Sequence, residues 1–190
     1  MSLLEIEGLK HSFGENLLYK NAGFTLNRGE HIGIVGQNGT GKSTLIKICT
    51  EQIIPDSGRI VWQPNTTIGY LDQYAEIDHT LTMKEFLKSA FTKLFEMEAQ
   101  ALQLYEKAAD GDMKSLELAA RYQEQLEAHD FYSIDTAIDR VANGLGLLAI
   151  GLDRPIAEMS GGQRAKVILA KLLLEKPDVL LLDEPTNFLD

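Results

Sequence analysis

Nine consecutive residues with small, charged and hydroxyl side chains form the stretch best equipped for chemistry. They are Gly36, Gln37, Asn38, Gly39, Thr40, Gly41, Lys42, Ser43 and Thr44. The three glycines let the backbone curl until successive N–H groups face inward, which makes a concave site for an anion. Lys42 can reach the β- and γ-phosphates of a triphosphate, and the Ser43 hydroxyl can ligate Mg²⁺. These residue types at this spacing predict a phosphate-binding loop.

The segments on either side decide whether this loop is a site or only a turn. The apolar residues 31–35 predict a buried strand before it, and residues 45–49 predict an amphipathic helix after it. A helix N-terminus adds free N–H groups and a partial positive charge. The alternative is a glycine-rich turn that binds no ligand, and the strand, turn and helix in this order argue against it.

Two carboxylates follow a second buried segment. Residues 179–182 are a continuous apolar run, and Asp183 and Glu184 come directly after it. Such a run fits a parallel strand covered on both faces, with the acids at the edge where the phosphate loop also emerges. Asp183 is then placed to hold Mg²⁺, and Glu184 to orient and partly deprotonate an attacking water. The alternative is a strand end capped by solvated acids.

A second anion-binding turn is predicted before the last helix. The residues are Ser160, Gly161, Gly162 and Gln163. A hydroxyl, two glycines and a helix N-terminus can bind an anion. Alone, the same residues also fit an ordinary turn and N-cap.

Two further positions stay open on the residues alone. Phe13 precedes Gly14 at the end of the first predicted strand, where an aromatic ring either stacks on a base or packs in the core. Gln73 follows the predicted strand of residues 68–71, and a glutamine in that place is usually a solvated polar residue.

The rest of the sequence predicts the strands and helices that position these residues. Residues 1–30 alternate like half-buried antiparallel strands, and a short strand is expected at residues 60–62. Apolar residues at helical spacing predict a long helix over residues 83–97, a second over 116–126 and a third over 133–143. Thr82 and Glu85 predict a capping box at the start of the first helix, and Gly111 with its neighbouring aspartates predicts the break before the second. Gly144 predicts a left-handed cap at the end of the third. We expect an ATP-binding core of residues 1–78 and 145–190, with a helical subdomain of residues 79–144 that contains an arm-like hairpin.

Composition excludes several function classes. The formal charge of −10 argues against broad electrostatic binding to nucleic acid or to an anionic membrane. No leader or apolar run long enough for a bilayer is present, so we expect a cytoplasmic protein without membrane insertion. The single cysteine, Cys49, excludes a disulfide within the chain and is expected to pack inside.

The order of GQNGTGKST, GYLDQ, MSGGQ and VLLLDEPTNFLD closely resembles the ATP-binding cassette (ABC) family. The resemblance implies an α/β fold, a P-loop NTPase of ABC type with an N-terminal antiparallel β subdomain and a helical insert. It further implies that residues 36–44 are the Walker A loop, residues 160–163 the signature, and Asp183 with Glu184 the Walker B pair. Gln73 becomes the Q-loop glutamine near the γ-phosphate and Mg²⁺, Phe13 the adenine-stacking aromatic, and Asp190 the D-loop aspartate.

Within the family, the tail of residues 185–190 and the helical insert are similar to the first cassette of the soluble ABC-F branch. Met159 and Phe188 depart from the usual leucine and histidine. The resemblance implies a second ABC cassette that shares two ATP molecules with this one, and contact with the ribosome through rRNA, a ribosomal protein or tRNA. The hairpin region between His79 and Asp130 has ten acidic and six basic residues, which fits an rRNA contact poorly.

Two other classes remain as alternatives. An ATPase subunit of a membrane transporter would use the insert to couple to a membrane partner, and the Asn187-containing tail argues against it. A DNA-repair or chromosome-associated cassette would need a longer coiled-coil or zinc-bearing insert. Because the sequence stops at Asp190, before the family's switch histidine, we expect residues 1–190 alone to bind Mg-ATP weakly and to hydrolyse it poorly.

Overall fold

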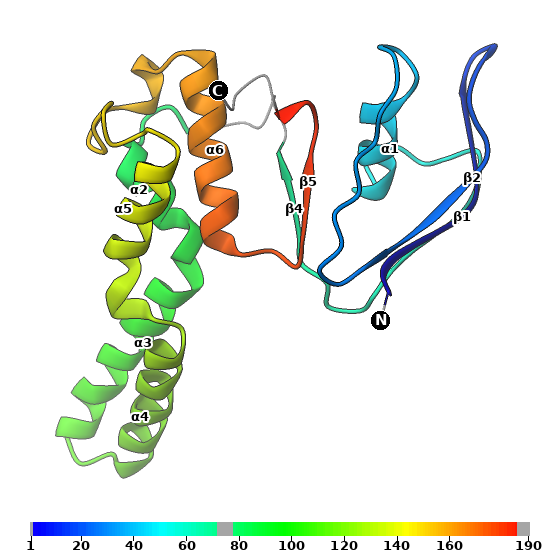
Figure 1. Ribbon diagram of the computed structural model, residues 1–190. Helices are drawn as coiled ribbons and strands as arrows, with labels where there is room; N and C mark the ends of the chain where they lie inside the picture. The colour runs from blue at the N-terminus through cyan, green and yellow to red at the C-terminus, as the bar shows by residue number, and fades with distance from the viewer. Residues whose placement is uncertain (1, 72–77, 186–190) are drawn as a thin grey trace. The chain divides into compact units, whose positions relative to one another are not determined.

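The computed structural model describes residues 2–71 and 78–185. In chain order the elements are β1 (Ser2–Phe13), β2 (Asn16–Asn27), α1 (Lys42–Cys49), β3 (Ser57–Trp62), β4 (Ile68–Leu71), α2 (Met83–Lys88), the 3₁₀ turn η1 (Ser89–Phe91), α3 (Thr92–Ala109), α4 (Met113–Ala128), η2 (Phe131–Ser133), α5 (Ile134–Gly144), η3 (Ile156–Glu158), α6 (Gly161–Glu175) and β5 (Val179–Leu182). Figure 1 shows this order by colour.

The chain divides into two compact units. Of the described residues, the α/β unit holds 2–71 and 176–185, and the helical unit holds 78–175. The helical unit thus also takes in residues 145–175, which the sequence places with the core. The reason is packing, because Leu147, Val167 and Leu174 belong to the same buried cluster as Met83 and Ile138.

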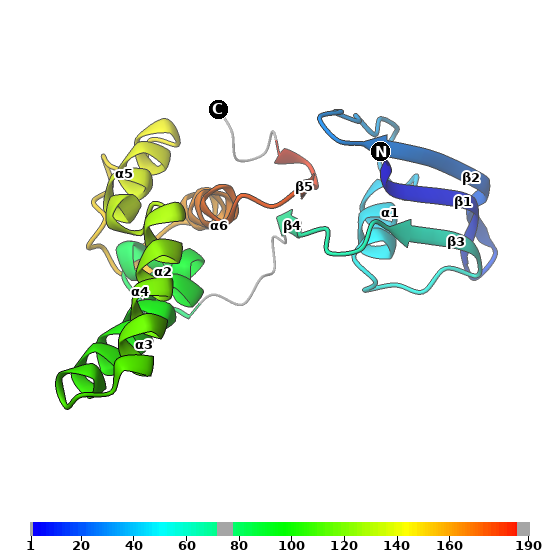
Figure 2. The ribbon, with the colours of Figure 1, turned by 90° about the horizontal axis from the view of Figure 1, so that it is seen from below.

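An antiparallel sheet begins the α/β unit, as the alternation of residues 1–30 predicts. The strand order is β2-β1-β3, with Ile6 of β1 opposite Phe24 on one side and Ile60 on the other. Figure 2 shows α1 against this sheet. The buried side chains between them are Leu4, Ile6, Leu9, Ile48 and Cys49, so the expectation that Cys49 packs inside is confirmed.

The two strands β4 and β5 form a separate parallel pair. Ile68 lies opposite Val179 and Leu71 opposite Leu182, which confirms the predicted parallel strand before the two acids. Val179 is buried, whereas residues 180–182 are only half-buried. The strand is therefore covered less completely than its apolar sequence suggests.

The predicted strand of residues 31–35 is wrong for this structure. These residues form no strand, and the side chains of Ile32, Ile34 and Val35 are 46%, 42% and 92% exposed. A strand exists only where neighbouring backbone groups complete its ladder. In the part of the chain that the structure describes, β5 pairs with β4 and no strand pairs with residues 31–35, so their apolar pattern has no ladder to join.

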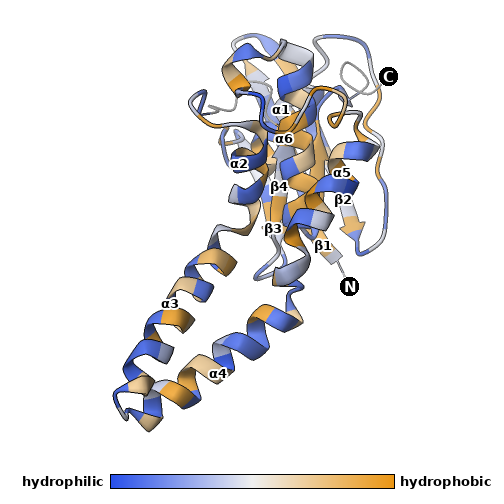
Figure 3. Cartoon of the chain, turned by 90° about the vertical axis from the view of Figure 1, so that its left-hand side faces the viewer, coloured by the Kyte–Doolittle hydropathy of each residue, from blue (hydrophilic) through white to orange (hydrophobic). Residues whose placement is uncertain are grey.

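The helical unit has its own core. Met83, Leu87, Leu126, Ile134, Ile138, Ile156 and Val167 are among its buried members. The predicted capping box is confirmed, because the Thr82 hydroxyl accepts from the Glu85 backbone N–H while the Glu85 carboxylate accepts from the Thr82 N–H. Figure 3 shows α3 and α4 as a hairpin with hydrophobic and hydrophilic stripes. The rings of Phe95 and Phe131 meet edge to face at 5.2 Å at its base.

The long helix predicted over residues 83–97 is divided in two. α2 ends at Lys88, and α3 begins at Thr92 after the 3₁₀ turn. The Ser89 hydroxyl donates to the Phe86 carbonyl at 2.6 Å, and the Thr92 hydroxyl donates to the Ser89 carbonyl at 2.8 Å. Hydroxyls that bond to the preceding turn compete with the helical ladder, which explains the break.

Among the described residues, the longest and most apolar helices are still too short or too polar to cross a bilayer.

Candidate functional site

The glycine-rich loop leads directly into α1, as predicted. Gly41 is the residue before the helix and has a φ of 101°, and Gly39 has a φ of 83°. These left-handed values strain any residue with a Cβ. The Thr40 hydroxyl donates to the Gln37 carbonyl at 2.9 Å and closes a tight turn over Gly36, whose missing Cβ would lie 2.9 Å from that hydroxyl oxygen.

The Lys42 ammonium lies across this loop. Its Nζ donates to the Gly36 carbonyl at 3.0 Å and to the Gln37 carbonyl at 3.1 Å. Carbonyl oxygens hold an ammonium less strongly than a phosphate oxygen does, because only the phosphate carries a full charge. The lysine is therefore close to the loop and able to exchange these bonds for bonds to phosphate.

A pocket of about 250 Å³ gathers most of the predicted nucleotide-binding residues of the α/β unit. It is lined by Phe13, Asn16, Leu18, Asn38, Gly39, Gly41, Lys42, Ser43, Thr44 and Glu184. These residues come from the end of β1, the start of β2, the glycine-rich loop, α1 and the segment after β5. The volume is below the roughly 300 to 1,000 Å³ of typical ligand sites, so a nucleotide would protrude from it.

A larger hollow of about 720 Å³ lies beside this pocket. Its walls include residues 29–34 and residues 177–185. Lys42, Asp183 and Glu184 all line it, so the lysine and both acids share one cavity. Asp183 does not line the smaller pocket, whereas Lys42 and Glu184 line both.

The two predicted Mg²⁺ ligands of the described residues are chemically suitable. Ser43 offers a hydroxyl and Asp183 a carboxylate, and Mg²⁺ is typically bound by one or two protein oxygens together with phosphates and water. No cluster of three acidic, histidine or cysteine side chains exists among the residues the structure describes. The predicted site therefore depends on phosphate oxygens to complete the coordination.

Glu184 has an unusual backbone conformation. Its φ is 46°, in the left-handed region that residues with a Cβ rarely adopt. Such conformations cluster where the chain must aim a functional group. Glu184 follows β5 and is one of the residues that line the pocket with Lys42 and Phe13.

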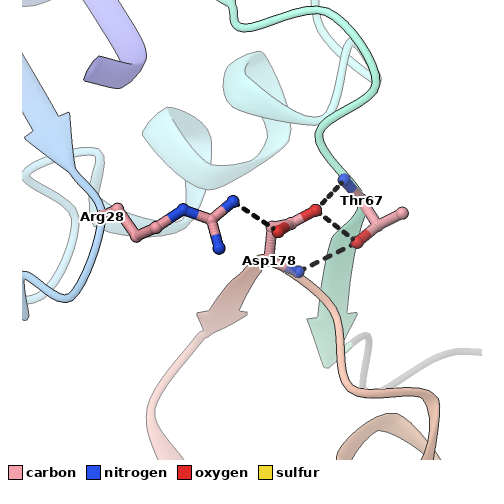
Figure 4. Close-up of polar contacts among 3 residues, drawn as sticks. All are labelled: Arg28, Thr67 and Asp178. Atoms are coloured by element: carbon pink, nitrogen blue, oxygen red, sulfur yellow. Dashed lines mark hydrogen bonds and ion pairs between the residues drawn. The ribbon is translucent and has the colours of Figure 1, made fainter. Parts of the chain in front are cut away.

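A polar network that the sequence did not predict fixes the start of β5 (Figure 4). Asp178 accepts from the Arg28 guanidinium at 2.9 Å, from the Thr67 backbone N–H at 3.1 Å and from the Thr67 hydroxyl at 2.9 Å. The Asp178 N–H donates back to that hydroxyl at 2.9 Å. The hydrogen bonds from Thr67, and then the hydrogen bond from Arg28, lower the pKa of the Asp178 carboxyl. The network ties the turn after β2 to both strands of the parallel pair.

Phe13 is half exposed at the end of β1, and its ring is supported by His11. The two rings meet edge to face at 4.8 Å. His11 is 5% exposed, with Nδ1 3.5 Å from the Asp56 carboxylate. The Ser12 hydroxyl donates to Asp56 at 2.8 Å and lowers the pKa of that carboxyl. Sequence reasoning missed His11, because its burial depends on β2 and on the turn before β3.

The predicted signature turn lies in the helical unit at the start of α6. The Ser160 hydroxyl accepts from the Gln163 N–H at 3.2 Å, and the Gln163 side-chain oxygen accepts from the Ser160 N–H at 3.0 Å. This reciprocal pair is a capping box, which is the ordinary turn and N-cap weighed from the sequence. Gln73 and Asp190 lie outside the described residues.

Comparison with known proteins gives a consistent result. A family model described as "ABC transporter" matches residues 19–187. The protein YfmM of Bacillus subtilis, an uncharacterized ABC transporter ATP-binding protein, is 46% identical over 194 residues, which cover 100% of this chain and 38% of YfmM. ABC transporter F family member 5 of Arabidopsis thaliana is 34% identical over 195 residues, covering 98% of this chain and 28% of the relative.

A third relative has a name that refers to translation. The energy-dependent translational throttle protein EttA of Escherichia coli K12 is 38% identical over 176 residues, covering 91% of this chain and 31% of EttA. The chain thus spans 28–38% of the length of these relatives. Solved ATP-binding cassettes of transporters match with TM-scores of 0.58 to 0.67 at 21–23% identity, and cover 97–100% of this chain and 62–72% of their own, which shows a common fold.

Proposed function

The chain belongs to the ABC transporter family of ATP-binding cassettes, with relatives in its F branch, and we propose that it binds and hydrolyses Mg-ATP at the 250 Å³ pocket. One observation carries the proposal. A single pocket is lined by three groups that are far apart in sequence: Phe13, residues of the 36–44 loop including Lys42, and Glu184. An aromatic platform, a cationic anion-binding loop and a carboxylate are the groups that a nucleoside triphosphate and its attacking water require.

The residues have separate roles in this proposal. Phe13 stacks on adenine, and the backbone N–H groups of residues 36–44 hold the phosphates together with the Lys42 ammonium. Ser43 and Asp183 would hold Mg²⁺, which neutralises charge on the phosphate oxygens when bound. Glu184 takes a proton from the water that attacks the γ-phosphate. Gln73 is proposed to sense the γ-phosphate and the metal.

A second cassette completes the proposed site. The Ser160 hydroxyl and the glycines Gly161 and Gly162 would donate hydrogen bonds to the γ-phosphate held by the other cassette. The length of the relatives supports this proposal, because each is more than twice as long as this chain. The small volume of the pocket also supports it, since a nucleotide that protrudes can be covered by a partner.

We further propose that the protein acts on the ribosome in the cytoplasm, as a translation factor or as a protector against antibiotics. The name of EttA, the tail of residues 185–190 and the α3–α4 hairpin support this proposal. The contact is with rRNA, a ribosomal protein or tRNA. The ATPase subunit of a membrane transporter is the competing function, and the transporter cassettes are too distant in sequence to favour it.

ATP turnover by the full-length protein tests the chemical part. Lys42→Ala and Glu184→Gln should each lower kcat by roughly 10²- to 10⁴-fold, the usual effect of removing a charge-stabilising or general-base group. Glu184→Gln should retain ATP binding, whereas Lys42→Ala should weaken it. Lys93→Ala and Glu124→Gln are matched controls in the hairpin and should leave kcat unchanged. Normal turnover in Glu184→Gln would contradict the assignment of the base.

Co-sedimentation tests the biological part. The Glu184→Gln protein should pellet with ribosomes when ATP is present and remain in the supernatant without nucleotide. The double variant Lys42→Ala with Glu184→Gln is the control, because it should not pellet in either condition. Co-purification with an integral membrane protein, and no pelleting, would favour the transporter function instead.

A further inference from the structure

Tyr19 of β2 reaches from the antiparallel sheet to the phosphate loop. Its hydroxyl donates a hydrogen bond to the Gly41 carbonyl. A Cβ added to Gly41 would lie 2.6 Å from the Tyr19 hydroxyl oxygen and 3.3 Å from Leu18 Cδ1. Side chains of β2 therefore press against the last glycine of the loop, and that glycine leaves room for them.

The Gly41 carbonyl has two donors. The Leu45 N–H bonds to it at 2.9 Å as the first bond of α1, and the Tyr19 hydroxyl takes its second acceptor position. A peptide unit is planar and trans, so the N–H of Lys42 points opposite to the Gly41 carbonyl. Since that carbonyl points along α1, the Lys42 N–H points out of the helix N-terminus toward the loop. Fixing the carbonyl thus also fixes one donor for a phosphate.

The ring and the hydroxyl of Tyr19 have separable tasks. The ring packs on the core formed by Leu4, Leu9 and Ile48 and lies opposite His11 across the β1–β2 ladder. The hydroxyl is not needed for that packing, since a phenyl ring fills the same space. Burial raises the pKa of Tyr19, so the group is a neutral donor at physiological pH.

We propose that Tyr19 is a positioning residue for the triphosphate: its hydroxyl orients the Gly41–Lys42 peptide so that the loop presents the Lys42 N–H to phosphate. This inference rests on the proposed function. It also gives the β1–β2 hairpin a second role, because the hairpin that carries Phe13 for the base also braces the loop for the phosphates. Phe13 and Gly41 line the same pocket.

The test compares ligands with and without the phosphate chain, using the full-length protein and its Tyr19→Phe variant. Calorimetry or competition should give a roughly fivefold loss of affinity for ATP and for tripolyphosphate, the value of one hydrogen bond. The affinity for AMP should be unchanged, because the base platform is intact. Tyr132→Phe is the matched control, since it removes a tyrosine hydroxyl that accepts from Gln123 in the helical unit at 3.0 Å.

The outcomes separate the inference from the function it rests on. Equal affinity of Tyr19→Phe and the unchanged protein for ATP would overturn the positioning role while leaving ATP binding intact. An equal loss for AMP and ATP would also overturn it, because a merely structural role affects the whole pocket. If the unchanged protein bound none of the three ligands, both the inference and the proposed function would be overturned.

Discussion

The helical unit has a large buried core, although some of its apolar side chains such as Leu102 and Met113 are exposed, whereas the α/β unit leaves a continuous apolar segment, residues 32–35, exposed. Ile138, Ile156 and Val167 of the helical unit are fully buried. In the α/β unit, Ile32 and Val35 lie beside the hollow or in solvent, although their sequence is as apolar as that of the helices. In the helical unit the apolar pattern of the sequence is therefore matched by burial, whereas in residues 31–35 it is not.

This difference follows from where each kind of element finds its hydrogen bonds. A helix bonds within four residues of itself, so α5 and α6 form as soon as their apolar faces meet. A central strand needs a neighbour on each edge, and such neighbours come from distant parts of the chain. Residues 31–35 lack that neighbour among the described residues, while β5 has β4 on one side.

Hydrogen exchange should show the largest difference between the two units. Amides of residues 31–35 should exchange near the rate of an unfolded peptide, because no described backbone bond protects them. Amides of α6 around Val167 should exchange at least about 10³-fold more slowly, as expected for a core helix. Mass spectrometry of peptic fragments from the full-length protein measures both. Slow exchange at residues 31–35 would mean that a backbone partner other than the described residues covers this segment.

Alanine substitutions should give the next largest difference between the units, in the free energy of unfolding. Ile138→Ala removes a fully buried side chain and should lower the free energy of unfolding by about 2 to 5 kcal/mol. Val35→Ala removes a side chain that is 92% exposed and should change it by less than about 0.5 kcal/mol. Urea denaturation followed by circular dichroism is the measurement. A large effect of Val35→Ala would show that this segment is packed in solution.

A smaller difference in thermal stability is expected between alanine substitutions at two glycines with the same backbone conformation. Gly41 has a φ of 101° and Gly111 a φ of 100°, so alanine strains both by about 1 to 2 kcal/mol. Only at Gly41 would the new Cβ collide with another residue, namely Tyr19. Gly41→Ala should therefore lower the thermal midpoint further than Gly111→Ala. Equal shifts would contradict the close approach of β2 to the loop.

The smallest effect is expected at the network of Figure 4 and depends on pH. The folded pKa of Asp178 is lowered, so its contribution to stability is present above the unfolded value of about 3.9 and is lost as the pH falls through the folded value. Asp178→Asn should be less stable than the unchanged protein at pH 6. The difference should shrink toward pH 2 in urea titrations, and a constant difference would exclude the charge as its cause.

Sequence reasoning succeeded where the signal is local. The Thr82 capping box, the break at Gly111 and the glycine loop before α1 each depend on residues within a few positions of one another. The antiparallel start and the parallel strand of residues 179–182 were also predictable, because alternation is typical of antiparallel strands and a continuous apolar run of parallel ones. The pairing of β5 with β4 was not predicted, and residues 180–182 are less covered than expected. The family is confirmed by the match over residues 19–187.

The failures have long-range or competing causes. Asp178 lies 150 positions after Arg28 and 111 positions after Thr67, so no sequence window joins it to them. The predicted left-handed cap at Gly144 is displaced, because α5 runs through Gly144 and the left-handed residue is Gly146. Tyr19 reads as an ordinary strand residue, and its role depends on a backbone carbonyl 22 positions later. The individual roles assigned to the site residues stay predictions.

The contact between the rings of Phe95 and Phe131 allows the length of the α3–α4 hairpin to vary between related proteins. The start of α3 and the end of α4 lie close together, because the rings of Phe95 and Phe131 are in contact. Equal numbers of turns can therefore be added to both helices without moving the rest of the helical unit. Seven residues in each helix would extend the appendage by about 11 Å. The length of the α3–α4 hairpin can therefore vary, while the side chains of the helical core keep the same positions.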